Sequence, residues 1–198
     1  DGGADVDTVE LTDSSDAFFL HDSFSAFHSS VTLVEDYDSR LGTARIANIE
    51  NINSGAGDDI VDLTSPDYSL AGQNITVDGG SGDDTLWGSD ANETLKGGVG
   101  DDVLFGGAGT NVLTGGAGAD EFQFTKSSTN DTVKDFSLGD GDTLKFFNKG
   151  GAQFDLGSVS LTGDVLSISD GTAFLTITLE GAGLQSNDLE SSDVLIIG

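Results

Sequence analysis

The sequence predicts an all-β fold in which short parallel strands stack into a solenoid. Three features support this prediction: a nine-residue unit repeats without gaps, one position of the unit is always apolar, and glycines recur at the same places. Alternation around the apolar position is typical of a short strand with one buried face. With 198 residues the chain is long enough for one elongated domain with appendages.

The repeat is clearest between residues 79 and 123. Five consecutive units read GGSGDDTLW, GSDANETLK, GGVGDDVLF, GGAGTNVLT and GGAGADEFQ. A further copy, SGAGDDIVD, occupies residues 54–62, and a weaker copy, GGADVDTVE, occupies residues 2–10. The eighth position is apolar in every copy: Val9, Val61, Leu86, Leu95, Leu104, Leu113 and Phe122. Each unit therefore predicts a three-residue strand whose central side chain enters the core.

The residues between these copies predict further turns and two insertions. RIANIENIN at 45–53 and LAGQNITVD at 70–78 fit the same register without the glycines, with Ile52 and Val77 at the eighth position. The insertions are residues 11–44, which contain a phenylalanine cluster, and residues 63–69. We expect a helix over 14–29. The predicted organisation is a roll over 1–123, interrupted at 11–44, and a continuous β-rich cap over 124–198.

One outward strip of the roll is expected to be apolar. Trp87 and Phe105 should stack on neighbouring turns, beside Val103 and Ile60. A strip of this size should be covered. We expect either residues 18–27 or the C-terminal segment to pack against it.

The charge of the chain excludes several functional classes. Seven basic residues stand against 35 acidic ones, which gives a formal net charge of -28. Binding to nucleic acid, or directly to an anionic membrane, is disfavoured because these partners carry the same sign. Cysteine is absent and the two histidines are His21 and His28, so a zinc-thiolate or transition-metal cluster is not expected. Hard cations that prefer oxygen ligands remain as partners.

Glycine and aspartate occupy positions of the unit that suit such a cation. Glycine at positions one, two and four allows a tight loop and leaves carbonyl oxygens uncovered. Aspartate at position six adds a carboxylate beside them. Calcium takes about six to eight oxygens, more than one loop supplies. We therefore expect calcium between two stacked loops.

The units resemble the G-G-x-G-x-D-x-U-x repeats of RTX (repeats-in-toxin) proteins, which form a calcium-binding parallel β-roll. The resemblance implies two units per turn, so that each unit stacks on the second unit after it along the chain. It also implies several calcium ions, about four or more, held between stacked loops. The ligands implied are Asp7, Gly55, Gly57, Asp59, Gly80, Gly82, Asp84, Gly98, Gly100, Asp102, Gly116, Gly118 and Asp120.

Alternation of units predicts that calcium lines one edge of the roll. Units beginning at residues 2, 54, 79, 97 and 115 fall on this edge, and each has aspartate at position six. The opposite edge receives Glu50, Ile75, Glu93 and Asn111 there, so its sites should be weak or absent. Its candidate ligands are Glu93, Gly107, Gly109 and Asn111. Loss of Asp102 should damage two adjacent sites, whereas Asn111→Ala should be nearly neutral.

The C-terminal part of the chain carries a second resemblance. TNDTVKDFSLGDGDTLKF at 129–146 is similar to the segment that follows the last repeats in type I secreted proteins, and Asp131, Asp135, Asp140 and Asp142 are further candidate calcium ligands. AFLTITL at 173–179 alternates like a strand. Residues 193–198, an acid followed by an apolar run, are similar to that family's uncleaved secretion signal and equally suit a final core strand.

Together these features predict a calcium-binding module that is not an enzyme. We expect it to stay extended in a calcium-poor cytosol, to leave a Gram-negative bacterium through the type I secretion apparatus, and to fold as a monomer on extracellular calcium. The resemblance favours the C-terminal cap of a secreted or cell-surface adhesin; the alternative is the module of a secreted protease, lipase or polysaccharide-modifying enzyme. Ice binding is disfavoured, because it needs threonine and asparagine on every turn and among the repeat loops only Thr110-Asn111 offers them.

Overall fold

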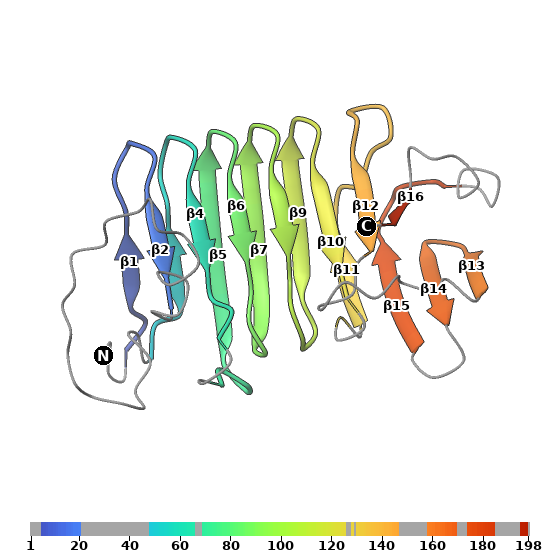
Figure 1. The fold of residues 1–198 in the computed structure, drawn as a ribbon, viewed down its shortest axis with the longest axis horizontal. Coiled ribbons are helices and arrows are strands. Elements are labelled where there is room, and N and C mark those ends of the chain that lie inside the picture. The colour runs from blue at the N-terminus through green and yellow to red at the C-terminus, as the bar shows by residue number, and fades with distance from the viewer. Residues whose placement is uncertain are drawn as a thin grey trace.

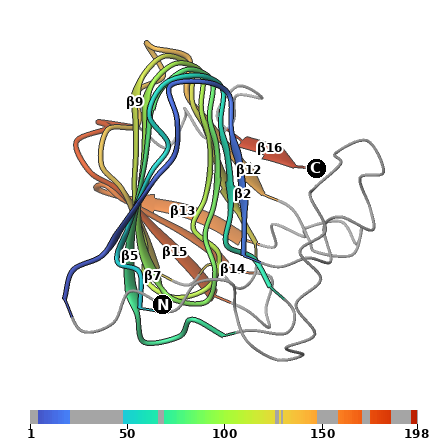
Figure 2. The same ribbon diagram turned by 90° about the vertical axis from the view of Figure 1, so that its left-hand side faces the viewer.

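In the computed structural model the chain is an elongated β-solenoid whose two sheets face each other (Figures 1 and 2). The structure describes residues 5–20, 48–65, 69–125, 128, 130–146, 158–169, 174–184 and 195–197. All regular elements in these ranges are strands, which confirms the all-β prediction. In the same ranges, no helix has the length and apolar character to cross a membrane.

The chain alternates between the two sheets as it winds. Sheet A contains nine described strands in the spatial order β1 (Thr8–Glu10), β3 (Asn51–Asn53), β5 (Asn74–Ser81), β7 (Asn92–Val99), β9 (Val112–Ala117), β11 (Asn130–Val133), β15 (Phe174–Leu179), β14 (Val165–Ser169) and β13 (Ser158–Thr162). Sheet B contains seven: β16 (Leu195–Ile197), β12 (Thr143–Phe146), β10 (Glu121–Phe124), β8 (Val103–Phe105), β6 (Thr85–Trp87), β4 (Ile60–Asp62) and β2 (Ala17–Phe19). Figure 2 looks along the solenoid and shows successive turns behind one another.

The register confirms two nine-residue units per turn in the regular part of the roll. Leu86 pairs with Leu104 and Leu104 with Phe122 in sheet B, while Leu95 pairs with Leu113 in sheet A. These five side chains, all at position eight, are 0% exposed and point between the sheets. Burying each of them contributes about 1.5 to 3 kcal/mol. The core is therefore one continuous apolar column that each turn extends.

The N-terminal turns correct the predicted first insertion. β1 stacks on β3 and β2 stacks on β4, in both cases with partners 43 residues apart. Residues 11–19, LTDSSDAFF, thus form a roll unit with Asp16 at position six and Phe18 at position eight. The expected helix over 14–29 is wrong for its first residues, because Ala17–Phe19 is a strand. The extra length follows Leu20, and residues 21–47 lie outside the described part.

No break in the roll marks the predicted boundary after residue 123. β11 pairs with β9 and β12 pairs with β10, so the solenoid continues through residue 146. β15 then adds a parallel strand to β11, and β14 and β13 extend sheet A as an antiparallel meander, seen at the orange end in Figure 1. β15 confirms the strand expected at 173–179. β16, paired with β12, makes the final apolar run a strand.

The predicted outward aromatic strip is present on sheet B. Trp87 and Phe105 stack on β6 and β8, and both are half-buried, while Ile60 is 39% exposed. The Nε1 atom of Trp87 is shielded from solvent. Phe19 and Asp62 continue the same column toward the N-terminus and are also buried. Two segments were expected to cover this strip. Most of residues 18–27, and much of the C-terminal segment, lie outside the described residues.

Candidate metal centre

The sixth residues of alternate units form a ladder of carboxylates along one edge of the roll. This aspartate ladder contains Asp16, Asp59, Asp84, Asp102, Asp120 and Asp142. At each step the backbone N–H of one aspartate donates to the Oδ1 atom of the next, with N···O distances of 2.6 to 3.0 Å. All members except Asp16 are buried. The ladder therefore links every turn of this edge to the following turn.

The hydrogen bonding of the second carboxylate oxygen, Oδ2, differs between the ends of the ladder and its interior. At the ends, Oδ2 of Asp16 accepts hydrogen bonds from the N–H and hydroxyl of Thr12, and Oδ2 of Asp142 accepts one from the N–H of Ser137. In the interior, Oδ2 is buried and accepts no hydrogen bond in three members: Asp59, Asp84 and Asp102. A buried, charged oxygen without a partner is strongly unfavourable. These interior oxygens are suited to a bound cation.

Glycine at position one leaves room beside the interior oxygens. A Cβ atom added to Gly97 would lie 2.2 Å from Oδ2 of Asp102 and 2.7 Å from the carbonyl oxygen of Gly115. One added to Gly79 would lie 2.4 Å from Oδ2 of Asp84 and 2.7 Å from the Gly97 carbonyl oxygen. Each such cradle joins the carboxylate of one turn to a carbonyl of the next. Hard oxygen donors from two turns are the donor type that calcium prefers.

The glycines at positions two and four lie where consecutive loops stack. A Cβ atom at Gly98 would be 2.2 Å from the Gly80 carbonyl oxygen, and one at Gly100 would be 2.1 Å from that of Gly82. The same contact repeats at Gly116 and Gly118, whereas Gly55 lies against the carbonyl of Thr12 and Gly57 against the backbone of Ser14 and Ser15. The backbone φ angles of these glycines are positive, for example 119° at Gly98. The predicted glycine carbonyls therefore face the next loop, as a shared site requires.

Side chains alone do not complete a site within the described residues. No three His, Cys, Asp or Glu side chains converge there in a way that could hold a metal ion. Backbone carbonyls must therefore supply most of the oxygens, including the position-one carbonyls of Gly97 and Gly115. The sequence-based ligand set contained the glycines at positions two and four and did not contain these two.

Asp7 lies on the opposite edge from the one predicted. Its N–H donates to Oε2 of Glu50 at 2.9 Å, while Asp16 donates to Asp59 on the ladder. The unit at residues 11–19 takes the ladder position of this first turn and displaces the unit at 2–10. Asp16 is thus the ladder residue that sequence reasoning missed. Its signal was an aspartate at position six and an apolar residue at position eight, without any glycine.

The opposite edge carries a shorter series of polar side chains. Ile75, which is 2% exposed, fills the sixth position between Glu50 and Glu93 and interrupts the series. Beyond it, the N–H of Glu93 donates to Oδ1 of Asn111 at 2.8 Å, and the N–H of Asn111 donates to Oδ1 of Asp131 at 3.0 Å. Oδ2 of Asp7, Oε2 of Glu93 and Oδ2 of Asp131 are buried without partners. Three oxygens suited to a cation therefore lie on the edge expected to be weak.

The side-chain amide of Asn111 occupies the space on the opposite edge that corresponds to a cradle of the ladder. Its Nδ2 atom donates to Oδ1 of Asp131 at 3.0 Å and to the carbonyl of Ala108 at 3.3 Å. A Cβ atom at Gly106 would lie 2.6 Å from this nitrogen, where the ladder has a carboxylate oxygen. Gly107 and Gly109 stack on the carbonyls of the preceding loop as their counterparts do. A hydrogen-bond donor in the cradle disfavours a cation at this step.

The remaining acidic candidates either accept hydrogen bonds at the end of the roll or are exposed to solvent. Both carboxylate oxygens of Asp135 are used: Oδ1 accepts from the N–H of Gly115 at 3.0 Å and Oδ2 from that of Gly116 at 2.9 Å. Asp135 therefore caps the last glycine loop. Asp140 is exposed in the turn before β12, whereas Asp142 ends the ladder.

Burial changes the acidity of the ladder. It raises the pKa of Asp84, Asp102 and Asp120 to about 6, and the negative charge of neighbouring aspartates adds to the effect. On the opposite edge burial raises the pKa of Glu93 to about 7 and that of Asp131 to about 6. A nearby cation would favour the charged forms instead.

A family comparison identifies the repeats. The family model for the RTX calcium-binding nonapeptide repeat (4 copies) matches residues 76–92 and 87–122. The chain carries RTX calcium-binding nonapeptide repeats. RTX repeats bind calcium, and the four copies fit several ions, so the predicted cofactor is confirmed. The matched repeats include Asp84, Asp102 and Glu93.

Two solved structures resemble the chain. Over 80% of this chain and 23% of the other, it is 20% identical to the extracellular lipase LipA from Serratia marcescens, with a TM-score of 0.37. Over 79% of this chain and 83% of the other, it is 22% identical to the AlgE6R3 subunit of the Azotobacter vinelandii mannuronan C5-epimerase, with a TM-score of 0.31. The chain thus spans less than a quarter of the lipase. No curated protein matches the chain.

Proposed function

We propose that this chain is a calcium-driven folding module of a type I secreted protein from a Gram-negative bacterium. The observation that carries the proposal is the row of buried, unpartnered Oδ2 atoms of Asp59, Asp84 and Asp102. Without calcium these carboxylates repel one another and oppose closure of the roll. Calcium removes the repulsion, so folding and ion binding become one event. The module stays extended until it leaves the calcium-poor cytosol.

The same geometry supports a role without catalysis. The paired acids of each loop do not act together, because Asp83 is exposed on the outside of the loop while Asp84 is buried. Oδ1 of Asp83 accepts the N–H of Asp101, and Oδ1 of Asp84 accepts that of Asp59. Both carboxylates thus stabilise the stacking of turns. We propose that the module performs no reaction of its own and caps a larger protein as a monomer.

Circular dichroism with calcium and chelator tests the switch. The spectrum in chelator should be that of a largely disordered chain, and added calcium should produce β-structure cooperatively. Magnesium should substitute poorly, because it demands a tight octahedron and loses its water reluctantly. A β-rich spectrum that persists in chelator would refute the proposal.

The larger protein is proposed to be a surface adhesin, with a secreted enzyme as the alternative. The resemblance of residues 193–198 to a secretion signal supports export through the type I apparatus. Export of the chain from a strain that carries this apparatus should therefore be lost when these residues are deleted. Sequence upstream of residue 1 separates the two cargoes, because repeated adhesive domains or a protease HExxH motif would decide between them.

A further inference from the structure

Three strands of sheet A carry the same tripeptide, which is an acceptor motif for covalent modification. Residues 74–76, 92–94 and 130–132 read N-I-T, N-E-T and N-D-T, so each has threonine two residues after asparagine and no proline between them. We call these tripeptides the sequons. The first two lie side by side, because Asn74 pairs with Asn92 and Thr76 with Thr94. The third lies on β11, two strands beyond β7 in the same sheet.

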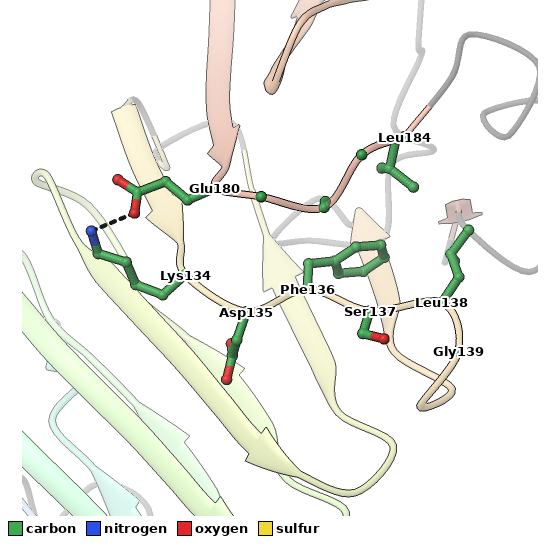
Figure 3. A pocket seen from close by; sticks show the side chains of 11 residues that line it. Lys134, Asp135, Phe136, Ser137, Leu138, Gly139, Glu180 and Leu184 are labelled. Atoms are coloured by element: carbon green, nitrogen blue, oxygen red, sulfur yellow. Dashed lines mark hydrogen bonds and ion pairs between the residues drawn. The ribbon is translucent and has the colours of Figure 1, made fainter.

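Each sequon presents its asparagine to solvent. The middle residues Ile75, Glu93 and Asp131 are 2%, 1% and 1% exposed and point into the roll. Because side chains alternate along a strand, the flanking asparagine and threonine point outward together. All three asparagines are exposed. The next outward side chain after the third sequon, Lys134, is held by Glu180 at 2.7 Å and leaves that sequon uncovered (Figure 3).

Stacking of the turns does not require the amide nitrogen of these asparagines. Oδ1 of Asn92 accepts the N–H of Thr110 at 3.0 Å. At the equivalent position of the other edge, Oδ1 of Asp83 accepts the N–H of Asp101 at 2.9 Å, so a carboxylate serves the same purpose. Within the described part of the chain, Nδ2 of the three sequon asparagines donates no hydrogen bond to protein. These nitrogens can therefore carry a substituent while the stacking hydrogen bond is kept.

We infer that the sequon asparagines are N-glycosylated. The donor is a hexose activated as a nucleoside diphosphate, and the partner is a glycosyltransferase of the bacterial cytosol that recognises both the asparagine and the threonine. Nδ2 attacks the anomeric carbon of the hexose, and the bond from that carbon to the diphosphate oxygen breaks. The nucleoside diphosphate leaves with the bonding electrons, and one Nδ2 proton passes to a base of the enzyme. The product is a hexose linked to the side-chain amide.

Glycosylation has to precede folding. β7, which holds the sequon at 92–94, pairs with β5 on one side and with β9 on the other. The backbone of a central strand is hydrogen-bonded along both edges, so it cannot leave the sheet to enter an enzyme. The interval for glycosylation rests on the proposed function, because the chain stays extended in the calcium-poor cytosol. After folding, each hexose projects into solvent without entering the core.

Peptide mass spectrometry of the chain secreted by its own bacterium tests the inference. Peptides with the sequon asparagines should carry the mass of a hexose on the asparagine. Asn111 is an internal control, because leucine and not serine or threonine stands two residues after it, and it should be unmodified. Unmodified asparagine in all three sequons, or equal modification of Asn111, would overturn the inference.

Thr94→Val removes one sequon and preserves the strand, since valine already occupies the paired position 112 in the next turn. The hexose should be lost from Asn92 and kept at the other two sequons. Thr114→Val is the matched control, because Thr114 is also half-exposed on sheet A and belongs to no sequon. A hexose that stays on Asn92 in Thr94→Val, or disappears from it in Thr114→Val, would contradict recognition of the sequon.

The order of glycosylation and folding is tested with the purified, unmodified chain, a soluble asparagine glycosyltransferase and nucleotide-activated glucose. Hexose should be added in chelator and not in calcium, while a short peptide with the sequence N-E-T should be modified in both. Equal modification of the folded and the unfolded chain would refute the order. Circular dichroism of the same samples reports folding separately. A chain that is folded in chelator counts against the proposed function, whereas native sequons without hexose count against glycosylation.

Discussion

Replacing Asp102 with asparagine should destabilise the calcium-loaded chain and stabilise the metal-free chain. The carboxamide keeps the shape of the carboxylate, and its oxygen can still accept the N–H of Asp84, which donates to Oδ1 of Asp102 at 2.8 Å. What is lost is the charge and the unpartnered Oδ2 atom. The substitution therefore separates cation binding from the hydrogen bonding of the ladder.

The expected magnitudes follow from the position of Asp102 in the ladder. Oδ1 faces the preceding turn and Oδ2 faces the cradle shared with Gly115, so the carboxylate borders two gaps. A site held at about ten times its dissociation constant contributes about 1.4 kcal/mol, and loss of two sites costs about 3 kcal/mol. For a chain of this size, the melting temperature in calcium should fall by about 6 to 12 °C. In chelator the sign reverses, because a buried charge among like charges is removed.

Thermal melts of the variant in calcium, its β-content by circular dichroism in chelator, and titration calorimetry measure both effects. Asp101→Asn is the matched control, since Asp101 is exposed, neighbours Asp102 and also accepts a backbone N–H from the next turn. Its calcium stoichiometry should equal that of the wild type. Equal losses of bound calcium in the two variants, or a fall in the β-content of the Asp102→Asn variant in chelator, would show that Oδ2 of Asp102 is not a ligand.

Four further predictions address the cradle, the opposite edge and pH. Gly97→Ala should abolish calcium binding at one cradle, since its Cβ would lie 2.2 Å from Oδ2 of Asp102, whereas Val99→Ala, at a site 60% exposed, should leave calorimetric stoichiometry unchanged. Asn111→Ala should not be neutral, as the sequence suggested, because it leaves the buried N–H of Glu93 without an acceptor. The free energy of unfolding from denaturant melts should fall by about 1 to 3 kcal/mol, and a change near zero would be the contrary result. Asn111→Asp should instead raise calcium uptake on that edge, measured by equilibrium dialysis. In chelator, acidification from pH 7 to pH 5 should increase the folded fraction of the roll, because the pKa of Asp84, Asp102 and Asp120 is raised to about 6 and the folded state then binds more protons than the unfolded state; a β-content, measured by circular dichroism, that falls on acidification would contradict this.

The regular part of the fold could be predicted because every turn repeats the same physical solution. Position eight must be apolar to enter the core, and glycine must occupy the bends, so Leu86, Leu104 and their neighbours reveal the register without a structure. The insertion at 63–69 could be placed because the complete unit 54–62 ends before it and the register resumes at 70–78; strand partners are 25 residues apart before it and 18 apart after it. The strand at 173–179 was visible from its alternation alone.

The N-terminal turn could not be predicted because its loop closes by other means. In LTDSSDAFF the bend is stabilised by Asp16, whose carboxylate accepts two hydrogen bonds from Thr12, and no glycine is needed. The search for glycine therefore missed a complete unit and assigned Asp7 to the wrong edge.

The ends of the ladder explain why calcium should act on the interior turns and not on the whole chain equally. Thr12 satisfies Asp16 at one end, and Ser137 satisfies Asp142 at the other, while Asp135 closes the last glycine loop with both oxygens. Between these ends each N–H depends on the carboxylate of the following turn, and each buried Oδ2 depends on a cation. In solenoids, stability is approximately a sum of repeat and nearest-neighbour terms. An interior ion therefore stabilises the two turns that it joins, and the protein-capped ends limit where such coupling can start and stop.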